Sequence, residues 1–153
     1  WGFDPFERHG PALVTEGPAA GETVRLLKPT SYMNRSGAAL ASLPDAVDPT
    51  RDLLVVVDDA ALDVGRVRFR PGGGAGGHNG LRSVEAVLGT RDYARLRLGV
   101  GVAPEGEDLS DWVLSPMPDD DEEVVVDLLA ELTDAVELWV EEGVEAAMNR
   151  FNR

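Results

Sequence analysis

Cysteine is absent from this sequence, and histidine occurs only twice, as His9 and His78. A disulfide framework and a thiolate zinc site are therefore excluded, and so is a histidine-rich metal centre. No apolar run is long enough to cross a bilayer, and no apolar stretch follows Trp1 as it would in a secretory signal. These absences lead us to expect a cytoplasmic protein with no membrane association.

Acidic residues outnumber basic ones by 28 to 14, which gives a net charge of −14. The excess lies after residue 103, where 16 acidic residues accompany 2 basic ones, while the 12 of each sign before it cancel. Seven arginines but only two acidic residues occur from Arg66 to Arg97. Because salt screens charges beyond about 8–10 Å, this local cluster can hold phosphates in an acidic protein. We interpret the acidic C-terminal part as a solvated helix face, with an acidic recognition surface as the alternative.

Strand and helix patterns alternate along the chain. Residues 53–57 form a continuous apolar run, which is typical of a strand buried at the centre of a mostly parallel sheet. Further strands are predicted at 12–15, 23–27, 65–70 and 94–102, the first two pairing across a loop at 17–21. Helices are predicted at 33–42, at 81–88, and from 119 onward with a break at Gly143. This order predicts an α/β fold over residues 1–153: a single-domain twisted mixed β-sheet flanked by helices, with a C-terminal helical cap.

A glycine-rich loop at residues 72–80 is the strongest local signal of function, and its sequence is GGGAGGHNG. Its formal GxGxxG pattern does not predict a Rossmann site, because the strand before it alternates arginine with apolar residues. It is not a Walker loop either, since no Gly-Lys-Ser/Thr follows. Backbone N–H groups in such a loop can approach a phosphate, a carbonyl or a sugar closely. We favour a functional loop that holds His78 and Asn79 at a helix entrance over a mobile surface loop.

Two other segments carry candidate residues, and each is ambiguous alone. Residues 28–37 have the sequence KPTSYMNRSG, in which Asn34 suits a helix cap, and Tyr32 and Met33 suit a core. Asp58 and Asp59 follow the apolar strand. Ligands of open α/β sheets bind at such strand ends, but carboxylates there also cap loops.

Taken together, these segments resemble bacterial-type peptidyl-tRNA hydrolases in an ordered set of motifs. The motifs are KPTSYMNRSG at 28–37, VVVDD at 55–59, the arginine strand with its glycine loop at 65–83, YARLRLGVG at 93–101, DWVLS at 111–115, and the C-terminal helix AVELWVEEGVEAAMNRF. The resemblance covers nearly all of the chain. The blocks around Asn34 and Asn79 are highly specific to that family.

The resemblance implies hydrolysis of the ester that joins a peptide to the 3′ ribose of tRNA, which releases tRNA for reuse. It also implies a monomer that uses no metal and no other cofactor. In the family a histidine acts as general base on water and a carboxylate orients that histidine. By motif, Asp58 is the expected carboxylate, and Asn34 and Asn79 are the amides that hold the peptide carbonyl and the water. The other implied contacts are Tyr32, Met33 and Gly76 in the peptide groove, His78 near the tRNA 3′ end, and Arg68, Arg70 and Arg97 on tRNA phosphates.

The resemblance breaks in two places. Family members place Gly-Asn-Pro-Gly and Thr-Arg-His-Asn motifs, the second with the general base, before the segment at which this chain begins. We therefore expect an N-terminally truncated domain that is inactive alone. The loop at 103–110 is acidic where the family often carries a basic residue. The alternative function is a non-catalytic RNA-binding paralogue, similar to splicing factors of plant organelles. A nicotinamide or nucleotide enzyme is a third alternative. The retained Asn34, Asp58, His78 and Asn79 favour the hydrolase.

Overall fold

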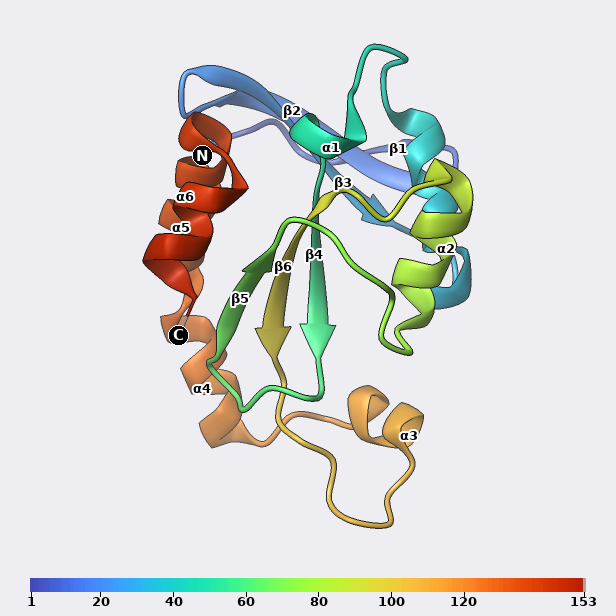
Figure 1. Ribbon diagram of the computed structural model, residues 1–153, viewed down its shortest axis with the longest axis vertical. Coiled ribbons are helices and arrows are strands. Elements are labelled where there is room, and N and C mark those ends of the chain that lie inside the picture. The colour runs from blue at the N-terminus through green and yellow to red at the C-terminus, as the bar shows by residue number, and fades with distance from the viewer. Residues whose placement is uncertain (153) are drawn as a thin grey trace. The chain divides into compact units, whose positions relative to one another are not determined.

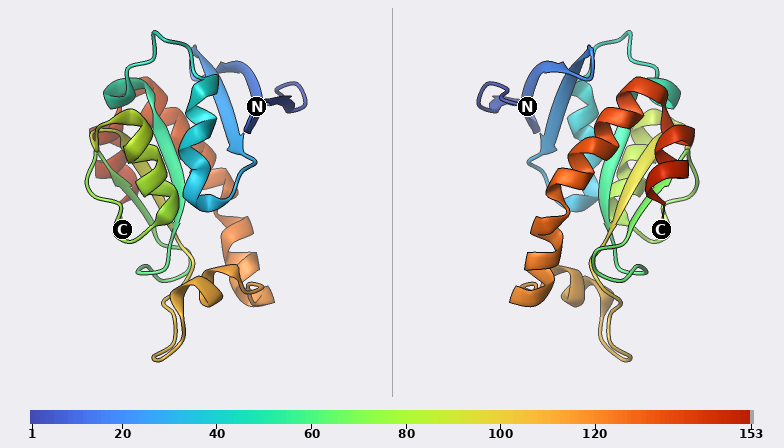
Figure 2. Two further views of the ribbon diagram at one scale, coloured as in Figure 1. Left: turned by 90° about the vertical axis from the view of Figure 1, so that its right-hand side faces the viewer. Right: turned by 90° about the vertical axis from the view of Figure 1, so that its left-hand side faces the viewer.

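The computed structural model describes residues 1–152 (Figures 1 and 2). The chain divides into two compact units that alternate along the sequence. The first unit comprises Trp1–Leu53 and Gly72–Tyr93, and the second comprises Leu54–Pro71 and residues 94–152. The mixture of strands and helices confirms the predicted α/β class. The prediction of a single domain stays a prediction.

An antiparallel sheet of three strands opens the first unit. Its strands are β1 (Glu7–His9), β2 (Ala12–Ala19) and β3 (Glu22–Pro29), in the order β1-β2-β3. The predicted pairing of the last two is confirmed, but the predicted loop at 17–21 is too long, because β2 continues to Ala19 and pairs it with Glu22. Ala20 and Gly21 alone make the turn, and both have left-handed backbone, with φ of 51° and 77°. Two such residues suit the twist of a tight hairpin.

Three helices complete the first unit: η1 (Met33–Ser42), α1 (Pro49–Asp52) and α2 (Asn79–Leu88). The bounds predicted for η1 are confirmed, although it is a 3-10 helix. It ends where Leu43 donates its N–H to the carbonyl of Leu40, one residue before Pro44. Gly89 ends α2 with φ of 68°, a left-handed conformation that glycine adopts without strain.

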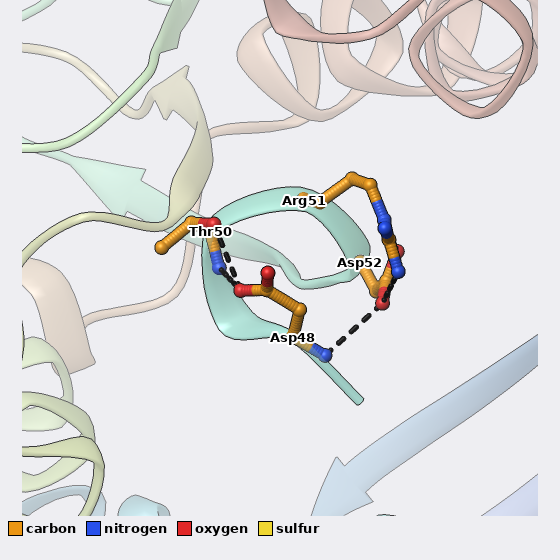
Figure 3. A network of polar contacts seen from close by, with 4 residues as sticks. All are labelled: Asp48, Thr50, Arg51 and Asp52. Carbon is orange, nitrogen blue, oxygen red and sulfur yellow. Dashed lines mark hydrogen bonds and ion pairs between the residues drawn. The ribbon is translucent and has the colours of Figure 1, made fainter. Parts of the chain in front are cut away.

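The short helix α1 was not predicted, and a network of polar contacts holds it (Figure 3). Asp48 caps the helix, because its Oδ1 accepts hydrogen bonds from the N–H and hydroxyl of Thr50 at 2.9 and 2.8 Å. Arg51 pairs with Asp52 at 2.7 Å, and Asp52 accepts the N–H of Asp48 at 3.0 Å. The hydrogen bonds from Thr50 lower the pKa of Asp48, and those from Arg51 and Asp48 lower the pKa of Asp52.

A mixed sheet of three strands forms the centre of the second unit (Figure 1). The strands are β4 (Leu54–Asp59), β5 (Val67–Arg70) and β6 (Ala94–Gly99), in the order β4-β6-β5. The β4–β6 pair is parallel and the β5–β6 pair is antiparallel. The prediction that the apolar strand lies at the centre is wrong, since β6 takes that place. Within this sheet β4 has a hydrogen-bonded neighbour on one side only, and Val56 is 54% exposed.

Four helices follow β6: α3 (Leu109–Leu114), α4 (Asp119–Asp127), α5 (Leu129–Glu142) and α6 (Val144–Phe151). The last two run along one face of the β4-β6-β5 sheet (Figure 2, right). They bury a core of six residues with this face: Val67, Phe69, Leu96, Ala135, Ala147 and Phe151. Gly143 separates α5 from α6 with φ of 86°, which confirms the predicted break. None of the helices in the described part of the chain combines the length and hydrophobicity of a membrane span.

Candidate active site

The Tyr-Met-Asn motif lies at the entrance to η1. Tyr32 precedes the helix in extended conformation, and its carbonyl accepts the N–H of Arg35 at 2.8 Å. Its side chain is 83% exposed and that of Met33 is 55% exposed, so the interpretation of both as core residues is wrong. Asn34 is the second residue of η1 and is exposed, and its side chain does not cap the helix. Exposed apolar side chains beside an exposed amide form a surface suited to a ligand with both apolar and polar groups.

The glycine loop leads directly into α2. Gly73, Gly76 and Gly77 have φ of 125°, 59° and 90°, which L side chains rarely adopt. A Cβ at Gly72 would lie 2.8 Å from the carbonyl oxygen of Arg91, and the same carbonyl accepts the N–H of Gly73 at 3.2 Å. The loop is therefore fixed at its start by the backbone that follows α2.

The first turn of α2 presents His78 and Asn79. The Nδ1 atom of His78 accepts the N–H of Leu81 at 3.2 Å and caps the helix. Asn79 is the first helical residue and is exposed, and its Oδ1 accepts a hydrogen bond from Arg82 at 3.4 Å. The predicted helix entrance for this pair is confirmed.

The two motifs are brought together because η1 packs against α2. A Cβ on Gly80 would lie 2.7 Å from the Sδ of Met33, so only glycine allows this approach. A Cβ on Gly37 would collide with the carbonyl of Ser83, whose hydroxyl accepts the N–H of Gly37 at 2.9 Å. Met33 thus faces Gly80, and Gly37 faces Ser83. The helix starts that carry Asn34 and Asn79 lie side by side within the first unit.

Asp58 and Asp59 end strand β4, in the second unit. Asp59 is 8% exposed, accepts the N–H of Ala61 at 2.9 Å and pairs with Arg97 at 2.6 Å. The loop-capping interpretation therefore holds for Asp59. Asp58 is half-buried, and its role as an orienting carboxylate stays a prediction.

The arginines of β5 and β6 share one face of their sheet. Arg68 lies opposite Arg97 in the strand register, and Arg70 lies opposite Arg95. The other face packs on α5 and α6 through Phe69 and its neighbours. Arg70 is exposed and Arg68 is half-buried, whereas Arg95 is only 3% exposed. Arg97 is engaged by Asp59, whereas neither Arg68 nor Arg70 has an ion pair among residues 1–152.

Sequence reasoning missed the residues that pack or pair with the candidates. They are Gly37, Gly80 and Ser83, and Asp59 as the partner of Arg97. The glycines and the serine stand inside the quoted motifs, but packing across two helices gives no local signal. Among the described residues no group of histidine, aspartate and glutamate side chains has the arrangement of a metal site.

Comparisons with known proteins identify the family to which this chain is similar. A model of the peptidyl-tRNA hydrolase family matches residues 2–153. The peptidyl-tRNA hydrolase of Chloroflexus aggregans is 44% identical over 156 residues, which cover 95% of this chain and 83% of that protein. That of Rhodococcus erythropolis is 44% identical, with 98% of this chain and 79% of that protein covered.

The fold agrees with solved structures as well. The crystal structure of peptidyl-tRNA hydrolase from Acinetobacter baumannii at 1.00 Å resolution matches with a TM-score of 0.89 and 30% identity, and the match covers 99% of this chain and 78% of that one. The chain is an α/β protein of the hydrolase class. It belongs to the peptidyl-tRNA hydrolase family.

Proposed function

We propose that this chain acts on peptidyl-tRNA, by hydrolysis of the ester between the peptide and the 3′ ribose. The observation that carries the proposal is the packing of η1 on α2, which sets the Tyr32-Met33-Asn34 entrance beside the His78-Asn79-Gly80 turn. Family membership favours hydrolysis over the RNA-binding alternative, since the relatives compared above are named as hydrolases.

Each candidate residue is given a role in ester hydrolysis from the chemistry of its side chain and from its position in the structure. The exposed amides of Asn34 and Asn79 can hold the ester carbonyl and the attacking water, and can stabilise the oxyanion that develops. Tyr32 and Met33, with Gly76 of the loop, offer apolar surface and open backbone to the peptide. His78 would lie near the tRNA 3′ end, where it holds the helix start and does not itself bind the ligand. The carboxylate of Asp58 would orient an imidazole that acts as general base.

Phosphate binding is assigned to the arginine face of the second unit. Arg68 and Arg70 are the main candidates, because their guanidinium groups are uncommitted to ion pairs among residues 1–152. Arg97 can add a phosphate contact while it pairs with Asp59. Three proposals remain. A cytoplasmic location rests on the composition of the sequence, and a monomer and a reaction without metal or other cofactor rest on the resemblance.

The two histidines of the sequence are not proposed as the general base. His9 lies outside the motif that carries the base in the family, and Nδ1 of His78 is occupied by the N–H of Leu81. The 153-residue chain should therefore cleave peptidyl-tRNA about 10²–10⁴-fold more slowly than an enzyme with a positioned base.

The test compares three proteins in cleavage of diacetyl-lysyl-tRNA. They are the 153-residue chain, a chain extended before Trp1 by a segment with the family's Gly-Asn-Pro-Gly and Thr-Arg-His-Asn motifs, and that extended chain with the added histidine changed to alanine. We expect the second protein to cleave this substrate about 10²–10⁴-fold faster than the other two. Full activity of the first that His78→Ala abolishes would show that the base is His78.

A further inference from the structure

His78 holds a helix end in a way that is unusual for histidine. It precedes α2 with φ of −72° and ψ of 114°, the extended backbone of an N-cap residue. Its Nδ1 accepts the N–H of Leu81, the third helical residue, at 3.2 Å. Serine, threonine, aspartate and asparagine are the usual residues here, because their short side chains reach the same N–H group. The backbone around His78 is also fixed, since its N–H donates to Ala75 and its carbonyl accepts from Arg82.

The cap defines the protonation of the ring. An Nδ1 atom that accepts a hydrogen bond carries no proton, so the proton of the neutral imidazole is on Nε2. A general base needs a free lone pair directed at the water from which it removes a proton. In His78 the Nδ1 lone pair is directed at Leu81, and Nε2–H is a donor. The ring is therefore arranged to hold the backbone and not to accept a proton from water.

The same ring lies against the surface that joins the two asparagine motifs. A Cβ at Gly80 would lie 2.8 Å from Cε1 of His78 and 2.7 Å from Sδ of Met33. The imidazole and the thioether thus both pack on the bare Cα of Gly80. Asn79 stands between His78 and Gly80, so its backbone is fixed on both sides while its side chain remains exposed.

We infer that His78 is a positioning residue, whose neutral imidazole caps α2 and thereby orients the amide of Asn79 toward the ester of peptidyl-tRNA. The identity of the ligand in this inference rests on the proposed function. The role of the ring rests on the geometry of the cap. The inference predicts that a residue without an imidazole can replace His78, provided that its side chain caps the helix.

The experiment uses the full chain and compares His78→Ala with His78→Asn. The probe is an adenosine that carries an N-acetylated amino acid through an amide at its 3′ position, which binds without being cleaved. Removal of a cap weakens the first turn by about five- to tenfold in its opening equilibrium. We therefore expect His78→Ala to speed exchange of the Leu81 amide hydrogen and to raise the Kd of the probe by about that factor, while His78→Asn stays within about twofold of the original chain.

Nitrogen NMR of His78 in the original chain gives an independent measurement, and we expect the Nε2–H form. A proton on Nδ1 would overturn the inference. It would also be overturned if His78→Asn protected the Leu81 amide but bound the probe as weakly as His78→Ala, because the imidazole would then contact the ligand itself.

Failure of the proposed function gives a different pattern. The original chain would not bind the probe, or Asn79→Ala would bind it unchanged. In that case, hydrogen exchange of the Leu81 amide and the tautomer of His78 still show whether the ring caps α2. The cap would then not serve to orient Asn79 toward a ligand.

Discussion

Two asparagines are exposed in the η1–α2 pair of the first unit, whereas two charged residues are buried in the β4-β6-β5 sheet of the second unit. In the helix pair, Asn34 and Asn79 are exposed. The helices that carry them are held by glycine contacts and by the hydrogen bond from the N–H of Gly37 to the hydroxyl of Ser83. In the sheet, Asp59 and Arg95 are buried, and Asp59 is paired with Arg97. The exposed amides contribute little to the native packing, whereas these buried charges of the sheet are part of it.

The contrast separates residues available to a substrate from residues that the fold already uses. An exposed amide can be removed with little loss of stability, but a buried charge left without its partner costs free energy. Activity should therefore be sensitive in the first region and stability in the second. The following substitutions test this division.

The largest effect is expected on catalysis. Asn34→Ala and Asn79→Ala are made in the extended chain described above and assayed for cleavage of diacetyl-lysyl-tRNA. Loss of an amide that stabilises the oxyanion lowers kcat by about 10²–10³, or about 3–4 kcal/mol. The free energy of unfolding should change by less than about 0.5 kcal/mol, because both side chains are exposed. Asn149→Ala, at another exposed helical asparagine, is the control. A loss of stability that accounts for the loss of activity would contradict the division.

The second prediction concerns Arg97→Met, which leaves the buried carboxylate of Asp59 without its ion pair. The side chain of Arg97 is 34% exposed, so solvent reduces the cost of a broken buried pair to about 2 kcal/mol. Urea denaturation measures this change. Arg66→Met, at an exposed position, should have little effect, and adding Asp59→Asn to Arg97→Met should recover part of the loss. Equal stability of the Arg66 and Arg97 variants would show that the pair contributes nothing.

The third prediction concerns Gly37→Ala, which places a Cβ where the carbonyl of Ser83 lies. The helices must separate, and we expect a loss of about 1–3 kcal/mol, as for other overpacked contacts. The urea midpoint should fall, and for the exposed neighbour Ala38→Ser it should change little. An unchanged midpoint would mean that η1 and α2 can shift without cost.

The fourth prediction concerns Arg68 and Arg70, two charged residues of the sheet that form no ion pair among residues 1–152. Arg68→Ala with Arg70→Ala should weaken tRNA binding and reduce the slope of log K against log salt by about one unit for each phosphate that the variant no longer binds. Stability should be nearly unchanged. Arg8→Ala with Arg150→Ala removes the same charge elsewhere and is the control. An unchanged salt slope in the first double variant would exclude this face from RNA binding.

The smallest effect is expected at α1, where the pKa of Asp48 is lowered by hydrogen bonds from Thr50 (Figure 3). A carboxyl group with a lowered pKa in the folded state contributes stability above its usual pKa of 3.8 and loses it as the pH falls through the lowered value. The NMR shift of the Thr50 amide should therefore change only below pH 3.8. Asp48→Asn should abolish this titration. A transition above that pH would mean that the cap does not form in solution.

Helix ends were predictable because their signals are local. The stops at Pro44, Gly89 and Gly143 depend on the backbone preferences of single residues, and the structure places the helix ends there. The centre of the sheet was not predictable in the same way. The apolar run of β4 suits a central strand, but the neighbours of a strand are chosen by pairing with distant segments, and β6 has two of them here.

For the candidate site, the sequence could single out residues but not the contacts between them. Sequence motifs singled out Asn34, His78 and Asn79, whereas the exposure of Tyr32 and Met33 depends on packing that no single segment specifies. Alternation likewise predicted that Arg95 and Arg97 share a face. It could not show that Arg95 is buried and that Arg97 has a carboxylate partner.

The side chain of Asn152 contacts β5 as a neighbouring strand would. Its Oδ1 accepts the N–H of Phe69 at 2.6 Å, and its Nδ2 donates to the carbonyl of the same residue at 3.1 Å. In the sheet β5 has β6 on its other side, so this amide occupies hydrogen-bonding groups that an edge strand leaves open. Open edges of this kind recruit strands from other molecules and promote aggregation. Asn152 therefore fills the place at which a strand from another molecule could pair with Phe69, and we expect its replacement to reduce solubility at high concentration before it reduces activity.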